Sequence, residues 1–132
     1  MALRLQREPG GPRLEQCSFA EAPAWLLRHR PADAGNGLLV FNAIGTVYLN
    51  EPDYRRLARG MTRVLASWQG RAVWVEYERP RDEPDGALEV KVHRAVDGRL
   101  QTCVLARGAP RPVELRVTGQ WGFMGEGETL MR

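Results

Sequence analysis

Hydrophobic and polar residues follow one another in blocks that predict a strand, a helix and a second strand in the middle of the chain. The segment Leu38–Ile44 is nearly continuous in apolar residues, which is typical of a parallel strand covered on both faces. The segment Ala72–Glu78, rich in valine and aromatic residues, predicts the second strand. A crossover helix between them makes the strands parallel, so their carboxyl ends meet at one edge of the sheet, where open α/β sheets bind ligands.

The crossover helix is predicted by its cap and by apolar residues at three- and four-residue steps. Asn50 is a favourable N-cap, Pro52 is tolerated early in a helix, and Gly70 ends it. The residues that recur on one face are Tyr54, Leu57, Met61, Val64, Leu65 and Trp68. The arginines between Arg55 and Arg63 fall largely off this face, which favours a solvated surface over a site for phosphate or an acidic partner.

A β-hairpin is predicted further along the chain. The dipeptide Asp97-Gly98 is a strong two-residue turn signal between strands over residues 88–95 and 99–106. In the first arm, apolar and polar residues alternate, so one face of the hairpin is expected to be in contact with water. The polar residues of that arm are Glu89, Lys91 and His93.

Two shorter elements complete the pattern. Ser18 can cap a short helix, with Glu21 completing a capping box, and that helix is expected to stop before Pro31. A last strand is predicted over residues 113–117. The fold class is therefore α/β, a Rossmann-like half domain whose small mixed sheet has one βαβ unit extended by an antiparallel hairpin. We expect a flexible arm over 1–16, a single α/β domain over 17–118 and a Gly-rich tail over 119–132.

Composition and charge narrow the class of protein. The 132 residues suit one small domain, and 43% hydrophobic with 27% charged residues is ordinary for a soluble globular protein. The net charge of +3 is too small to indicate nucleic acid, and no apolar run approaches the roughly 20 residues of a membrane span. The N-terminus lacks a signal-peptide core, and Cys17 and Cys103 have no metal-like spacing. We therefore expect a cytoplasmic protein with no nucleic-acid or membrane partner.

The candidate ligand-binding residues lie near the carboxyl ends of the two predicted strands: Asn42, Tyr48, Glu76 and Glu78. Because side chains alternate along a strand, Glu76 and Glu78 point to the same side, where two carboxylates could share a proton or hold a cation. The alternative is that Glu78 is solvated and Glu76 pairs with an arginine. Asn42 interrupts an apolar strand, so it either lines a site or fixes the loop that follows.

Other residues with useful chemistry are more scattered. His29 and His93 have no Cys, Asp or second His at ligand spacing, so we expect no metal site, and no catalytic triad can be nominated from spacing. The tail is different, because an apolar cluster in a Gly-rich segment favours docking on its own domain or on another chain. The candidate interface residues are Trp121, Phe123 and Met124.

The ordered segments Gly37–Ile44, Tyr48–Pro52, Arg59–Leu65 and Arg71–Glu76 resemble the second half of a class I S-adenosylmethionine-dependent methyltransferase. In that family a fourth strand ends in a polar residue and leads to a helix that ends in a Val-Leu-like pair. A fifth strand and an antiparallel closing hairpin follow. The resemblance implies that Asn42 lies where the family contacts substrate or the methyl-bearing end of the cofactor.

A narrower resemblance concerns two short motifs. Pro31-Ala-Asp before the apolar strand and Trp74-Val75-Glu76 are similar to the C-terminal part of an uncharacterised bacterial domain-of-unknown-function family. The chain departs from the methyltransferase pattern at the cofactor site, since it has no equivalent of the Gly-rich turn after the first strand or of the acidic residue ending the second. The resemblance therefore implies a half domain that binds no cofactor by itself.

These observations favour a non-catalytic, methyltransferase-like half domain that acts as a binding or assembly module. One alternative is half of a split S-adenosylmethionine-dependent methyltransferase completed by another chain; a second is a small-molecule-binding domain. Because few strands can flank Leu38–Ile44, we also expect a homodimer or a partner protein to cover it.

Overall fold

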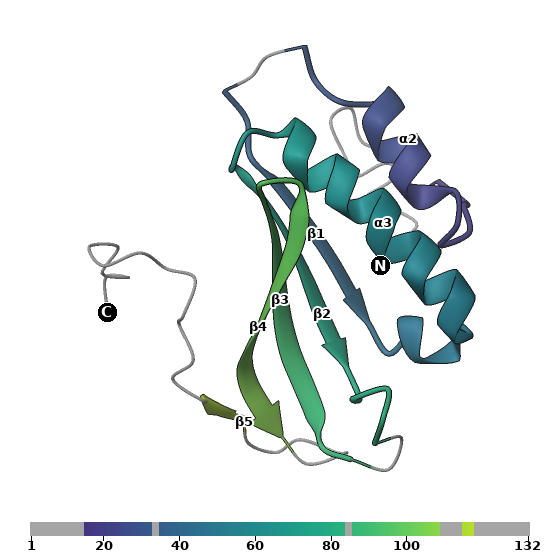
Figure 1. Cartoon of the computed structure of the whole chain (residues 1–132), viewed down its shortest axis with the longest axis vertical. Coiled ribbons are helices and arrows are strands. Elements are labelled where there is room, and N and C mark those ends of the chain that lie inside the picture. Colours follow the sequence, from purple (N-terminus) through teal and green to yellow (C-terminus); the bar gives the residue numbers. More distant parts are fainter. Residues whose placement is uncertain (1–14, 33–34, 84–85, 109–114, 118–132) are drawn as a thin grey trace, which may run out of the picture.

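The computed structural model describes residues 15–32, 35–83, 86–108 and 115–117. Figure 1 shows a twisted sheet with both helices on the same side. In chain order the elements are α2 (Ala22–Arg28), β1 (Leu38–Ala43), the 3-10 helix η1 (Thr46–Tyr48), α3 (Glu51–Ser67), β2 (Ala72–Glu78), β3 (Leu88–Val96), β4 (Arg99–Gly108) and β5 (Leu115–Val117). The predicted arm falls almost wholly outside the described residues, and the predicted tail lies entirely outside them.

The sheet has the strand order β1-β2-β3-β4-β5. Strands β1 and β2 are parallel, with Asn42 opposite Glu76, and the remaining pairs are antiparallel. The predicted α/β fold is therefore confirmed: one βαβ unit, β1-α3-β2, is extended by the hairpin of β3 and β4. Asp97 and Gly98 have φ values of 48° and 73°, as a two-residue turn of this kind requires.

The helix α3 begins and ends as its sequence predicts. The side-chain oxygen of Asn50 accepts a hydrogen bond from the Asp53 backbone N–H at 2.9 Å, which satisfies one of the unpaired donors of the first turn. At the other end, Gln69 and Gly70 have positive φ values of 53° and 81°, and the chain turns into β2. The glycine adopts this conformation without the steric penalty of a side chain.

The hydrophobic core lies between α3 and one face of the sheet. The fully buried residues of this cluster are Leu57, Met61, Val64, Leu65, Ala72 and Trp74. The short helix α2 packs on the outer side of α3 (Figure 1), where Pro23 lies so close to Gly60 that an added Cβ would come within 2.8 Å of its ring. The predicted capping box is present before α2, since Ser18 and Glu21 exchange hydrogen bonds between backbone and side chain.

The prediction that Leu38–Ile44 is covered on both faces is wrong. Among the described strands β1 lies at the edge of the sheet, and α3 and α2 cover only one side. We call that side the helix face, which carries Trp74 and Glu76, and the opposite side the open face, which carries Leu39 and Phe41. On the open face Leu39 is 67% exposed and Phe41 is 62% exposed.

The prediction that the polar side of the hairpin is in contact with water is also wrong. His93 lies opposite Trp74, and Glu89 lies opposite Glu78, so both share the helix face. They are 2% and 5% exposed. The prediction that apolar and polar residues of β3 point to opposite faces is correct. The polar face is nevertheless buried, because it packs against α3 and pairs with neighbouring polar groups.

Within the part of the chain that the structure describes, no helix is long and apolar enough to cross a membrane.

Candidate functional site

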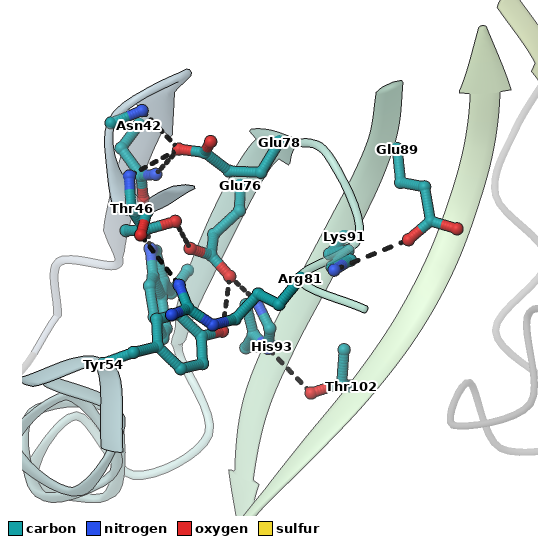
Figure 2. Close-up of polar contacts among 12 residues, drawn as sticks. Asn42, Thr46, Tyr54, Glu76, Glu78, Arg81, Glu89, Lys91, His93 and Thr102 are labelled. Carbon is teal, nitrogen blue, oxygen red and sulfur yellow. Dashed lines mark hydrogen bonds and ion pairs between the residues drawn. The ribbon is translucent and has the colours of Figure 1, made fainter. Parts of the chain in front are cut away.

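Three of the four candidate strand-end residues belong to a polar cluster, which we define as Asn42, Thr46, Tyr54, Glu76, Glu78, Arg81 and His93 (Figure 2). The parallel register brings Asn42 beside the carboxylates of β2, and η1 and α3 contribute Thr46 and Tyr54. Glu76 and Glu78 are 1% and 3% exposed, so every charge in this cluster needs a partner within the fold.

Glu78 holds the turn that follows β1. Its Oε1 accepts hydrogen bonds from Asn42 Nδ2 at 2.9 Å, from the Gly45 backbone N–H at 2.6 Å and from the Thr46 backbone N–H at 2.9 Å. Its other oxygen, Oε2, is buried without a hydrogen-bond partner among the described residues. One carboxylate oxygen therefore satisfies two backbone donors that the turn leaves unpaired, so Glu78 is not solvated as the alternative interpretation supposed.

Asn42 links β1 to the core as well as to Glu78. Its Oδ1 accepts a hydrogen bond from Trp74 Nε1 at 2.6 Å, while its Nδ2 donates to Glu78. Both ends of the amide are thus engaged inside the protein, which explains how an amide is accommodated in an otherwise apolar strand.

Both oxygens of Glu76 accept hydrogen bonds. Thr46 Oγ1 donates to Oε1 at 2.8 Å, the Tyr54 hydroxyl donates to Oε2 at 3.0 Å, and His93 Nε2 lies 2.7 Å from Oε2. Burial raises the pKa of Glu76, but hydrogen bonds from His93, Thr46 and Tyr54 outweigh it and hold the pKa below its usual value. Burial, followed by the charge of Glu76, raises the pKa of the Tyr54 hydroxyl.

His93 continues this chain of contacts to the edge of the core. Its Nδ1 lies 2.7 Å from Thr102 Oγ1, and its ring packs against Trp74 with 4.5 Å between centroids. Carboxylate, imidazole and hydroxyl thus stand in the order of a nucleophilic relay. The imidazole is 2% exposed, however, and Thr102, an exposed residue of the β3-β4 ladder, lines neither the cavity beside Trp68 nor the cavity beside Lys91. The arrangement is therefore better suited to fixing His93 than to admitting a substrate.

Five residues of this arrangement were not among the candidate site residues predicted from the sequence: Thr46, Tyr54, Arg81, His93 and Thr102. Arg81 donates to the carbonyl oxygens of Thr46 at 2.9 Å and Leu49 at 2.6 Å, and its guanidinium lies 4.5 Å from the centre of the Tyr54 ring. No sequence signal distinguishes it within its polar loop. Thr102 could have been predicted as the partner of His93. A turn centred on Asp97-Gly98 fixes the register of the hairpin, and this register places Thr102 opposite His93.

The structure brings together three of the four candidate ligand-binding residues, Asn42, Glu76 and Glu78. Tyr48 is 82% exposed and is not part of the polar cluster. The candidate interface residues Trp121, Phe123 and Met124 lie outside the described residues. Ligand binding by the cluster therefore stays a prediction.

Within the described ranges, no group of three or more His, Cys, Asp or Glu side chains is arranged to hold a metal ion. A scan against protein-family models finds no match, and searches of curated proteins and of solved structures find no similar chain.

Proposed function

We propose that the chain is a non-catalytic binding and assembly module that associates with a second copy of itself through β1. The observation that carries this proposal is the exposure of Leu39 and Phe41 on an edge strand whose outer backbone groups pair with no strand among the described residues.

The state of the polar cluster supports a non-catalytic role. Asn42 uses both ends of its amide, and both oxygens of Glu76 accept hydrogen bonds within the fold. A substrate that used these groups would have to displace buried partners, and each buried group left unsatisfied costs about 1–3 kcal/mol. Their role is therefore to hold β1, η1 and β2 in one arrangement.

The backbone of β1 supports pairing at its edge. The N–H of Leu38 bonds to the Arg71 carbonyl, and the N–H of Ile44 bonds to the Tyr77 carbonyl. Because hydrogen-bonding direction alternates along a strand, the groups of the odd-numbered residues from Leu39 to Ala43 point away from β2. The segment contains no charge and no proline, two devices that proteins use to block edge-to-edge pairing. Two-fold pairing of β1 with β1 satisfies these groups and closes the assembly.

Light scattering behind a sizing column tests the proposal. The wild type is expected to be a dimer at about 10 μM, a concentration that populates a complex of micromolar affinity. Phe41→Lys places a charge at the paired edge and is expected to give a monomer with unchanged circular dichroism. The matched control is Tyr48→Lys, which adds the same charge at an exposed position outside β1. A monomeric wild type, or equal dissociation by both variants, would contradict the proposal.

A further inference from the structure

A second feature of the helix face borders the polar cluster: a cavity of about 380 Å³ beside β3 and β4, whose lining residues Lys91 and Glu89 lie opposite Glu76 and Glu78. Its walls include Pro80, Asp82 and Glu83 from the loop after β2, and Glu89, Lys91 and Arg107 from the two strands. This volume is within the range of small-molecule sites. We propose that the cavity binds a small zwitterion of the amino-acid type, with its carboxylate at Lys91 and Arg107 and its ammonium at Asp82 and Glu83.

Lys91 is the main reason to expect an anionic group in the cavity. It is the only lysine of the chain, and its side chain is only 18% exposed. Glu76 lies opposite it in the strand ladder but is occupied by other donors. Within the described residues, the partner of the Lys91 ammonium is Glu89 at 3.5 Å (Figure 2). An ammonium has three donors, so this one long contact leaves it able to bind a carboxylate oxygen.

Arg107 and Glu89 complete the part of the cavity that the two strands line. The Glu89 side chain is 7% exposed and accepts from Arg107 Nε at 2.9 Å, so it orients the guanidinium as well as the Lys91 ammonium. Two cations against one carboxylate leave one positive charge where β3 and β4 line the cavity. A ligand carboxylate balances this charge and gains charge-assisted hydrogen bonds.

The loop after β2 brings the opposite charge to the cavity. Asp82 and Glu83 line it and are both exposed. Arg81, their neighbour in sequence, is directed to the carbonyls of Thr46 and Leu49 and therefore does not neutralise them. Strand-borne cations and loop-borne carboxylates around one cavity match a ligand that carries both charges. A simple anion would be repelled by Asp82 and Glu83.

Titration followed by amide chemical shifts tests this site with three probes of similar size: diglycine, which is zwitterionic, N-acetylglycine, which is only anionic, and glycinamide, which is only cationic. Diglycine is expected to bind in a saturable way, with each of the other two at least about tenfold weaker, or about 1.4 kcal/mol. Equal affinity for diglycine and N-acetylglycine, or no saturable shift with diglycine, would overturn the proposal.

Variants locate the binding to this cavity. Lys91→Gln and Arg107→Gln are each expected to weaken diglycine binding about tenfold, because each removes one charged partner of the carboxylate. Arg99→Gln is the matched control, since it removes the same charge at an exposed position by the hairpin turn. Arg107 is 62% exposed, so its substitution remains informative if Lys91→Gln fails to fold. Unchanged affinity in Arg107→Gln would contradict the assignment. The cavity is remote from the edge of β1, so this test is independent of self-association.

Discussion

The strands β1 and β2 differ in which side chains they expose: β1 exposes apolar side chains, whereas β2 buries carboxylates. On its open face, β1 exposes Leu39 and Phe41, at 67% and 62%. On its helix face, β2 buries the carboxylates of Glu76 and Glu78, at 1% and 3%. The two strands are hydrogen-bonded neighbours with the same parallel backbone geometry. The difference in burial therefore comes from where each strand lies in the sheet and from which face the helix α3 covers.

Each strand has a physical reason for this arrangement. The carboxylates of β2 are tolerated inside because donors from β1, η1, α3 and β3 reach them, which offsets the loss of water. The apolar side chains of β1 remain outside because the described part of the chain offers nothing to cover them. Burying them releases about 25 cal/mol per Å² of apolar area, a driving force that remains for association. The difference therefore separates a region that holds the fold together from a region available to a partner.

The largest effect on stability is expected from His93→Ala. The substitution leaves the Glu76 carboxylate buried without its imidazole partner, and losing a partner of a buried charged group costs more than the about 1–3 kcal/mol typical of a neutral one. The cavity left by the buried ring adds to this loss. Urea denaturation measures the free energy of unfolding. Phe41→Ala, on the exposed edge, is the control and, measured at a concentration too low for dimers to form, is expected to cost less than about 1 kcal/mol. Similar losses of unfolding free energy in both variants would contradict the distinction between the buried carboxylates of β2 and the exposed edge of β1.

A smaller loss, of about 1–3 kcal/mol, is expected for Asn42→Leu, because the Trp74 indole and the Glu78 carboxylate each lose a hydrogen-bond partner. The melting temperature should fall, while Gln101→Leu, at an exposed strand position, should leave it nearly unchanged. Unchanged or higher stability together with a lost ligand response would instead indicate a binding site. No change in stability or binding would mean that these hydrogen bonds contribute little.

The buried carboxylate also predicts a dependence on pH. Hydrogen bonds from His93, Thr46 and Tyr54 outweigh burial and hold the pKa of Glu76 below 4.5 in the folded protein. Its contribution to stability is therefore present above pH 4.5 and is lost as the pH falls through the folded-state pKa. Unfolding free energy measured against pH should decline more steeply in the wild type than in Glu76→Gln. Parallel curves would show that other groups cause the acid sensitivity.

The smallest effect, no detectable heat of binding, is expected when S-adenosylmethionine is added to the isolated chain. If Asn42 and its neighbours serve the fold, calorimetry should detect no binding of this cofactor. An affinity in the micromolar range, about −8 kcal/mol, would contradict the non-catalytic proposal and favour the split-methyltransferase alternative.

Local patterns accounted for most of the secondary structure. The Asn50 cap and the apolar stripe predicted α3, and Asp97-Gly98 predicted the hairpin turn. The candidate site was predicted in part, because the alternation rule places Glu76 and Glu78 on one side and the parallel register adds Asn42. Arg81 could not be predicted, since a loop residue reaches its partners only after η1 and α3 are in place.

The sequence by itself determined where strands, helices and turns begin, since caps, turn residues and hydrophobic periods act over a few neighbouring positions. The tertiary structure alone decided which face of each element is buried. An alternating strand such as β3 has a polar and an apolar side, and its sequence does not say which one α3 will cover. His93 was therefore predicted to contact water and is instead 2% exposed, while Phe41 was predicted to be covered and is 62% exposed. Burial depends on contacts between segments far apart in the chain, and these contacts form only when the sheet order is fixed.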